Sequence, residues 1–511
     1  MSKNGPTSAE DAQSSEEFVQ LIEFQLNKIC KCKTFNLLSE EVLRELITRH
    51  GLKPNNNLNI RDYEFFLWVC ANERVTEGII RCLLEYFPDA GSFTSTDGKT
   101  PLHLICNNTN VTRSMVELLI DAAPNSVRIV TQLGWMPLHC LCLNRKLDDE
   151  TSMEILKLLI QKCPQAVRHA DYDTGFLPVH RACGSRAPDF CRVLIEAYPG
   201  SERITASNGM LPIHIACMSN TVATVEYLYK LYPEVIHHKT ANGVYPIHFA
   251  MKGIKKRPSP GPDPMDAVDV VQFLLDCDPT VKLQTIGGRI SLLHFACRQQ
   301  YTHPNIEAAL EMIKVIYDAH PEAIEDSRIV STFQYFHQQV QTFLNTQLVY
   351  SRQARDHRLM MTPDVNGQLP LHTALQSNVR LGSIKLLVKG NPSAIRTFDR
   401  SGLIPLHVAC RHHDSTVVQY LVGLDTTTLD AMDREGNTAL HCACLGAEFD
   451  TIALLLDKYD AVSVSKRNAQ KKLPIDILWD SNAVVNRESV EYTESVFRLL
   501  KAYPETVMNI E

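Results

Sequence analysis

The sequence predicts an all-α fold in which one two-helix repeat recurs along the chain and stacks into a solenoid, with short hairpin turns between the repeats. Three observations lead to this prediction. A phrase of proline, an aliphatic residue and histidine keeps returning, a glycine stands five residues before most of these histidines, and a segment with an apolar stripe at helical spacing follows each phrase. The copies are 34 to 46 residues apart, except for one interval of 78 residues.

The hairpin turn of each repeat is marked by its glycine. Dipeptides such as Asp97–Gly98 and Asn366–Gly367 supply the positive φ that a tight hairpin turn needs. The glycine precedes eight of the histidines, at Gly98, Gly134, Gly175, Gly209, Gly243, Gly367, Gly402 and Gly436.

The first helix of a repeat is predicted to begin at the proline of the phrase, because the fixed φ and missing N–H of proline suit the first helical turn. Two altered copies, at Leu67 and Asp476, flank the clear ones. The clear copies contain His103, His139, His180, His214, His248, His294, His372, His407 and His441.

The second helix of a repeat carries apolar residues at helical spacing, as at Val116, Leu119 and Ile120. A proline then ends it, because proline removes an amide donor and clashes with the preceding turn. Phe87–Pro88 and Tyr232–Pro233 are examples of this ending.

The order turn, helix, turn, helix with a period of about 33 residues resembles the ankyrin repeat family, whose recurring phrase is Thr-Pro-Leu-His-x-Ala. The copies most similar to it are 100–103 (TPLH) and 438–441 (TALH). The resemblance covers residues 61–326 and 364–511, two blocks of repeats, and implies an ankyrin-type helical repeat solenoid that binds proteins. Most other copies replace the threonine by an apolar residue, which removes a capping hydroxyl worth about 1 kcal/mol.

Both ends of the chain depart from the repeat. Residues 1–15 are polar and predict a disordered tail. Residues 16–60 predict a helical cap with amphipathic helices over 16–32 and 39–50, because the terminal repeat of a solenoid needs a polar cover. The second block, 364–511, is expected to include the C-terminal cap.

The long interval predicts an insertion over residues 327–363. Residues 331–358 contain no glycine or proline, and the apolar residues Phe336, Val340 and Leu344 suit one continuous amphipathic helix. A worn repeat is the alternative. A stripe of this kind left in water would be an aggregation-prone patch, so we expect the helix to dock on the array or to hold a partner.

Composition and charge narrow the function. The 511-residue chain has a net charge of -7, so no basic face predicts a nucleic-acid partner. No apolar run approaches the roughly 18–20 residues of a membrane span. The polar start is not a secretory signal, which predicts an intracellular protein, cytoplasmic or nuclear, whose 16 cysteines are free thiols.

Seven first helices contain His-x-x-Cys, which raises the alternative of a thiol-based or metal-based sensor. A structural zinc site needs four ligands, whereas one repeat offers two and neighbouring helices lie about 8–10 Å apart. We therefore predict a packing role for these residues and no metal site. No nucleotide-binding, hydrolase, metalloprotease or kinase signature accompanies them, so we predict no catalytic residue, no cofactor and no enzyme activity.

The predicted function is a protein-interaction scaffold or adaptor, acting as a monomer through the concave surface of the stacked repeats. The sensor is one alternative, and an adaptor that brings a client to a modifying enzyme through the N-terminal helices is another.

A candidate binding ridge follows the hairpins of the first block. The residue after the turn glycine is expected to face solvent, and stacking would place equivalent residues side by side. The ridge consists of Trp135, Phe176, Met210 and Val244, with Tyr172 beside the second. Large aromatic residues of this kind dominate many interfaces. The alternative is that each side chain packs on the neighbouring hairpin. Later repeats have Gln368, Leu403 and Asn437 instead.

Overall fold

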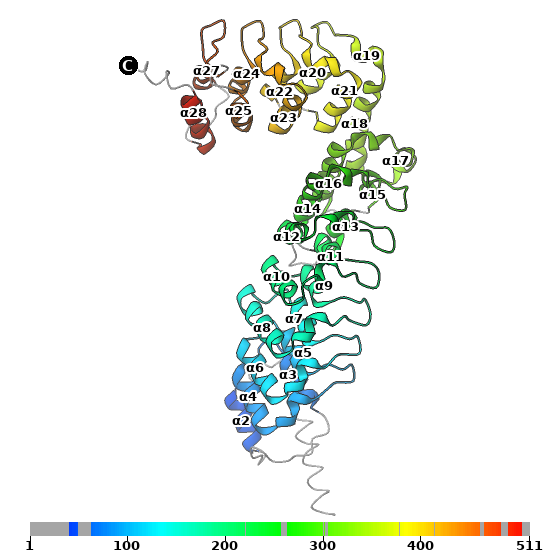
Figure 1. Cartoon of the computed structure of the whole chain (residues 1–511), viewed down its shortest axis with the longest axis vertical. Coiled ribbons are helices and arrows are strands. Elements are labelled where there is room, and N and C mark those ends of the chain that lie inside the picture. Colours follow the sequence, from blue (N-terminus) through cyan, green and yellow to red (C-terminus); the bar gives the residue numbers. More distant parts are fainter. Residues whose placement is uncertain are drawn as a thin grey trace, which may run out of the picture. The chain divides into compact units, whose positions relative to one another are not determined.

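The computed structural model (Figure 1) describes residues 40–49, 63–219, 221–256, 263–299, 301, 305–377, 379–412, 414–459, 464–481 and 489–502. Over these ranges the regular elements are helices and no strand occurs, which confirms the all-α helical repeat solenoid. The chain divides into two compact bodies, Met1–Arg289 and Ile290–Glu511, called the N-terminal and the C-terminal body below. The division falls inside the block predicted over 61–326.

In the N-terminal body, the repeats form an inner and an outer row of helices, and each helix packs on the next one of its row. The inner row is α3 (Glu64–Ala71), α5 (Pro101–Cys106), α7 (Pro137–Leu143), α9 (Pro178–Cys183), α11 (Pro212–Ser219) and α13 (Pro246–Lys256). The outer row is α4 (Glu77–Tyr86), α6 (Arg113–Ala122), α8 (Asp149–Lys162), α10 (Pro188–Ala197), α12 (Val222–Leu231) and α14 (Pro264–Cys277).

A proline stops most outer helices, as the sequence predicts. The residue before the proline leaves the helical region, as Phe87 does at φ -132°, because the proline ring disfavours helical backbone at the preceding position. Short 3-10 helices follow: η2 (Pro88–Ser92), η3 (Pro124–Arg128), η4 (Pro164–Arg168), η5 (Ser201–Arg203), η6 (Pro233–His237) and η7 (Pro279–Leu283).

Consecutive hairpins are joined through their backbones. The amide of Gln132 donates to the carbonyl of Asp97 at 2.9 Å. This close approach explains the glycine: Gly98 has φ +83°, and a Cβ there would lie 2.8 Å from the Cα of Thr131. A side chain at this position would therefore strain the turn and push the next hairpin away.

In several repeats the recurring histidine ties one repeat to the next. Nδ1 of His103 accepts the amide N–H of Thr100 at 3.2 Å, and its Nε2 lies 2.9 Å from the carbonyl oxygen of Trp135 in the following hairpin. His407 repeats this arrangement with Ile404 and Ala431. A nitrogen that accepts an amide hydrogen carries no proton, so the ring is neutral and donates through Nε2. The histidine is thus a structural bridge, in line with the predicted packing role.

The C-terminal body continues the two-row arrangement around its own apolar core. Its inner helices are α15 (Leu292–Cys297), α20 (Pro370–Gln376), α22 (Pro405–His412), α24 (Ala439–Gly446) and α27 (Pro474–Asp480). Its outer helices are α16 (Ile306–Ala319), α21 (Leu381–Gly390), α23 (Ser415–Leu424), α25 (Phe449–Leu456) and α28 (Val490–Ala502). The 3-10 helices η9 (Pro321–Glu325), η11 (Pro392–Arg396) and η12 (Thr426–Asp430) follow α16, α21 and α23.

The prediction of one continuous helix over 331–358 is wrong. The segment forms α17 (Ser327–Thr332), η10 (Phe333–Tyr335), α18 (Gln338–Arg355) and α19 (His357–Met361). Phe336 is extended, with ψ 159°, and its buried ring lies 6.5 Å from that of His294. Burial of this ring overrides the helical preference of the local sequence, which contains no glycine or proline to announce a break.

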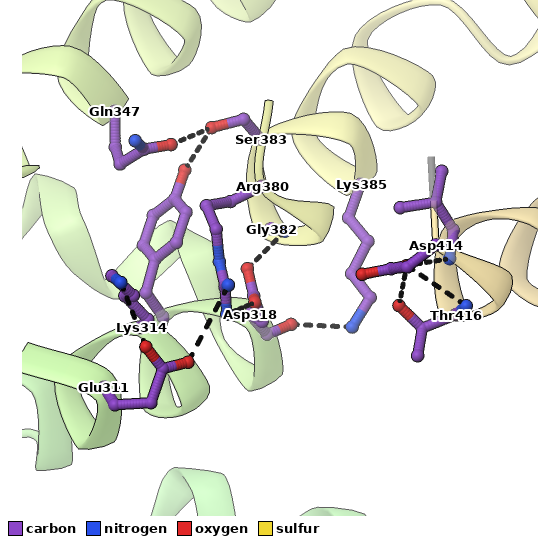
Figure 2. Close-up of polar contacts among 12 residues, drawn as sticks. Glu311, Lys314, Asp318, Gln347, Arg380, Gly382, Ser383, Lys385, Asp414 and Thr416 are labelled. Atoms are coloured by element: carbon purple, nitrogen blue, oxygen red, sulfur yellow. Dashed lines mark hydrogen bonds and ion pairs between the residues drawn. The ribbon is translucent and has the colours of Figure 1, made fainter. Parts of the chain in front are cut away.

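A buried polar cluster fixes the insertion to its neighbours (Figure 2). The hydroxyl of Tyr317 donates to Ser383 at 2.8 Å, and Ser383 donates to Gln347 of α18 at 2.7 Å. Asp318 accepts the amide of Gly382 at 2.7 Å and pairs with Arg380 at 2.6 Å. Helices α16 and α21 therefore touch directly, and α18 also packs on α21. That residues 327–363 are an insertion, with a worn repeat as the alternative, stays a prediction. The expected docking of the segment on the array is confirmed.

The N-terminal cap is described only in its second helix. Helix α2 (Glu40–Arg49) matches the helix predicted over 39–50 and packs on α4. Leu43 is buried, and Arg44 pairs with Glu85 at 2.8 Å. The tail predicted over 1–15 and the helix predicted over 16–32 lie outside the described residues.

Candidate protein-binding surface

The structure separates the residues of the predicted ridge. Phe176, Met210 and Val244 are buried, so the expectation that they face solvent is wrong for these three. Phe176 and Met210 belong to a small apolar cluster beneath the hairpins, against which Phe249 packs. The residue after the turn glycine begins the return of the chain toward the inner helices, and its side chain covers the next repeat.

Trp135 and Tyr172 remain accessible. Tyr172 is 65% exposed, whereas Trp135 is partly buried. The guanidinium of Arg181 lies 5.0 Å from the Trp135 ring and 4.8 Å from the Phe176 ring, and pairs with the buried Asp171 at 2.5 Å. Arg181 thus fixes the indole by a cation–π contact.

A groove of about 400 Å³ opens beside Trp135, between two hairpins and the inner helices α5 and α7. Leu104, Leu133 and Leu143 give it an apolar lining, and Lys99 stands at its edge. Leu133 is 54% exposed although it lies directly before a turn glycine. Because its wall is apolar and accessible, this groove suits the aliphatic or aromatic side chain of a partner.

Leu133 was missed by sequence reasoning. Asp97, Asn208 and Asn242 occupy the same position before the glycine in other hairpins, where they favour the turn. Leucine offers no such local advantage. An apolar residue at this position was therefore a signal for a surface role.

A second groove, of about 390 Å³, occupies the corresponding place in the C-terminal body. Counted from the first-helix position of the recurring histidine, Gln470, Lys472 and Asp480 stand where Leu133, Trp135 and Leu143 stand in the first groove. Lys472 pairs with Asp480 at 2.6 Å. The same backbone site is apolar in one body and charged in the other.

The histidines and cysteines have the chemistry of a packed interior. Burial lowers the pKa of His103 and His214 to about 4. Burial raises the pKa of Cys140 to about 12 and that of Cys442 to about 11, so these thiols stay protonated and unreactive near neutral pH. Across the described residues, no cluster of three or more metal-ligating side chains occurs. None of the helices described is long and apolar enough to span a bilayer.

Known proteins provide two kinds of match. A family model of three consecutive ankyrin repeats matches residues 149–240, 336–430 and 371–468, and a single-repeat model matches residues 97–129. Together these ranges cover about half of the chain. The number of repeats, about nine to eleven from the nine clear and two altered copies of the phrase, stays a prediction.

One curated relative is rabankyrin-5 from Mus musculus, which is 24% identical over 114 residues. The match covers 22% of this chain and 10% of that protein. The matched part therefore spans about a tenth of the length of this relative.

Proposed function

This chain belongs to the ankyrin repeat family, a family of protein-interaction repeats, and from this premise we propose that it is a non-catalytic scaffold or adaptor. The partner is a protein, and neither nucleic acid nor a cofactor takes part. The protein acts as a monomer inside the cell. Its N-terminal body binds a partner through the groove beside Trp135.

The observation that carries this proposal is the apolar groove with the exposed Leu133 at its edge. A partner side chain inserted there would contact Leu104 and Leu143 and lose its own hydration. Each Å² of apolar surface removed from water contributes about 25 cal/mol. The indole of Trp135 is already fixed by Arg181, so little side-chain entropy is lost on binding.

Tyr172 extends the surface to the next hairpin. Its amide donates to the carbonyl of Leu133 at 2.9 Å, which keeps the two exposed residues adjacent. The proposed binding surface is therefore Leu133, Trp135 and Tyr172. Phe176 supports this surface through Arg181, whose guanidinium lies against both the Phe176 and the Trp135 rings.

Peptides selected from a random displayed library on the full chain would test the proposal. We expect selected peptides to contain an aliphatic or aromatic anchor and to bind the Leu133→Asp variant at least about tenfold more weakly, because the substitution places a charge in an apolar site. Gln470→Asp is the matched control, since Gln470 holds the equivalent place in the second groove. Unchanged affinity for both Leu133→Asp and Tyr172→Ala would contradict the proposal, as would a selection that yields no peptide.

A further inference from the structure

The hairpins of the C-terminal body carry apolar and basic side chains on their outer edge. Val365, Phe398 and Met432 are 79%, 53% and 42% exposed. Exposed arginines lie on the hairpins of Phe398 and Met432 and on the hairpin that follows them. We call this set the basic ridge: Val365, Phe398, Arg400, Met432, Arg434 and Arg467.

The backbone places these residues in rows. Phe398 and Arg400 are two residues apart, as are Met432 and Arg434, and in each pair the exposed apolar residue comes just before the turn in which the exposed arginine lies. The amide of Arg400 donates to the carbonyl of Asn366 at 3.0 Å, and the amide of Arg434 donates to that of Ser401 at 3.3 Å. These bonds hold neighbouring hairpins together, so the ridge is continuous from one hairpin to the next.

The aspartates of these hairpins accept backbone amides, as the exposed Asp364 does from Asn366 and Gln368. Asp399 is buried and accepts the amides of Ser401 and Leu403 at 2.8 and 2.9 Å. Asp433 is buried in the same way and accepts the amides of Glu435 and Asn437. Asp399 and Asp433 shape the turns and do not extend into the solvent beside the arginines.

The charge of the basic ridge is therefore left uncompensated. Within the part of the chain that the structure describes, the guanidinium groups of Arg400 and Arg434 have no carboxylate partner. Arg467 donates to the carbonyl of Lys471 at 2.8 Å. Glu435 is exposed beside Arg434 in the same turn, and its carboxylate accepts a hydrogen bond from the side-chain amide of Asn437 at 3.3 Å. A positive surface results on a chain whose net charge is -7.

We propose that the basic ridge is a second docking site, which binds an acidic segment of a partner protein in which Asp or Glu alternate with aromatic or aliphatic residues. Arginine forks pair with carboxylates through two hydrogen bonds. Phe398 and Met432 lie on the same hairpins as Arg400 and Arg434. Met432 and Val365 expose aliphatic surface, which the apolar side chains of a peptide would cover and phosphates would not. This favours a peptide over a nucleic acid.

The N-terminal body lacks this combination. Gln132, Tyr172, Ser207 and Ala241 occupy the hairpin positions that correspond to Arg400 and Arg434. Ser207 and Ala241 are joined to their neighbouring hairpins by the same kind of backbone hydrogen bond. The site is therefore distinct from the groove beside Leu133, and the N-terminal hairpins offer matched control positions for it.

Fluorescence anisotropy on the full chain tests the proposal with a labelled peptide of alternating Glu and Phe or Leu residues. We expect saturable binding that weakens as salt rises. A peptide with serine in place of the apolar residues should bind about tenfold more weakly, as should one with glutamine in place of glutamate. A single-stranded oligonucleotide that binds more tightly than the alternating peptide would overturn the proposal in favour of nucleic acid.

Charge reversal locates the site. The double variant Arg400→Glu/Arg434→Glu should lose at least about tenfold in affinity for the alternating peptide, whereas Ser207→Glu/Ala241→Glu should keep it. Phe398→Ser, with unchanged charge, should weaken binding without altering its salt dependence. Equal binding by both double variants would overturn the proposal, and so would self-association of the chain that the alternating peptide fails to displace. The Leu133→Asp variant keeps the basic ridge intact. If this variant no longer binds the library peptides but still binds the alternating peptide, the result bears on the groove and not on the basic ridge.

Discussion

The hairpins of the two bodies share one backbone design but distribute polar and apolar residues in opposite ways. Beneath the N-terminal hairpins, Phe176 and Met210 form an apolar cluster. Beneath the C-terminal ones, Asn437 donates to Asp433 at 3.0 Å and accepts from Asn468 at 2.9 Å. The position after the turn glycine is buried at Phe176 and Met210 in one body and at Asn437 in the other. It is filled by packing in the first and by hydrogen bonds in the second.

The outer edges show the reverse distribution. The C-terminal edge carries Phe398 and Met432 with the arginines of the basic ridge, whereas the N-terminal edge is mostly polar and gathers its accessible apolar residues around Leu133 and Tyr172. The residues buried beneath a hairpin therefore do not predict whether the exposed residues on its edge are polar or apolar. Because each interior is complete without the edge residues, the edges are free to serve recognition.

Acidification should have the largest effect on the stability of the repeats. Burial lowers the pKa of His139 and His180 to about 4 and that of His248 to about 3, below the value of about 6.5 expected in the unfolded chain. The unfolded state then binds more protons, so stability is complete above pH 6.5 and is lost as the pH falls toward 4. Each pKa unit contributes about 1.36 kcal/mol per histidine.

Urea midpoints at pH 7 and pH 5 measure this loss, with Trp479→Phe used so that the remaining tryptophans report on the N-terminal body. We expect a midpoint several-fold lower at pH 5. Burial also lowers the pKa of His407 and His441, so the C-terminal body should follow in the same direction. Midpoints that do not change between these pH values would show that the histidines are not buried in neutral form.

Phe176→Ala tests the apolar cluster beneath the N-terminal hairpins and should have the next largest effect on stability. The substitution leaves a cavity beside Met210 and removes one of the two rings that hold Arg181. Loss of a buried phenylalanine typically costs about 3 kcal/mol or more. Equilibrium unfolding in urea gives this value, and a loss below about 0.5 kcal/mol would mean that the ring contributes little packing.

Asn437→Ala tests the hydrogen bonds beneath the C-terminal hairpins. It should lower the free energy of unfolding by less, about 1–3 kcal/mol. The variant leaves the side-chain donor of Asn468 and one oxygen of Asp433 with fewer partners in a buried place. The same urea titration, followed through Trp479, measures the change. A loss of stability equal to that of Phe176→Ala would contradict the expected difference between the apolar and the hydrogen-bonded hairpin interiors.

Local chemistry explains what the sequence could predict. Glycine, proline and histidine act within a few residues, so the turns, the first helices and the helix ends were predictable from their spacing. The burial of Phe176 was not, because it depends on the neighbouring hairpin and on Phe249 in a later repeat. The break at Phe336 also depends on a distant contact, with His294.

The candidate surface was predictable only in part. Trp135 was identified because it follows a turn glycine, and Tyr172 because it lies beside the next ridge residue, and large aromatic residues dominate many interfaces. The groove itself combines residues from two repeats, and its lining by Leu104 and Leu143 follows from how the inner helices stack. Spacing along one repeat does not contain that information.

Substitutions on the exposed hairpin edges should have the smallest effects on stability, and they separate residues that pack from residues that are free to bind a partner. Tyr172 and Phe398 both lie on hairpin edges with more than half of their surface in water, so Tyr172→Ala and Phe398→Ser should each change the free energy of unfolding by less than about 0.5 kcal/mol. Urea unfolding at pH 7 measures both, with Phe176→Ala as the interior reference. A cost above about 1 kcal/mol for Phe398→Ser would place this ring in the packing of the C-terminal body. Its effect on peptide binding would then reflect a disturbed fold. If Phe398→Ser leaves the free energy of unfolding unchanged, this large aromatic side chain is exposed to water without stabilising the fold. That is what we expect of a residue that binds a partner.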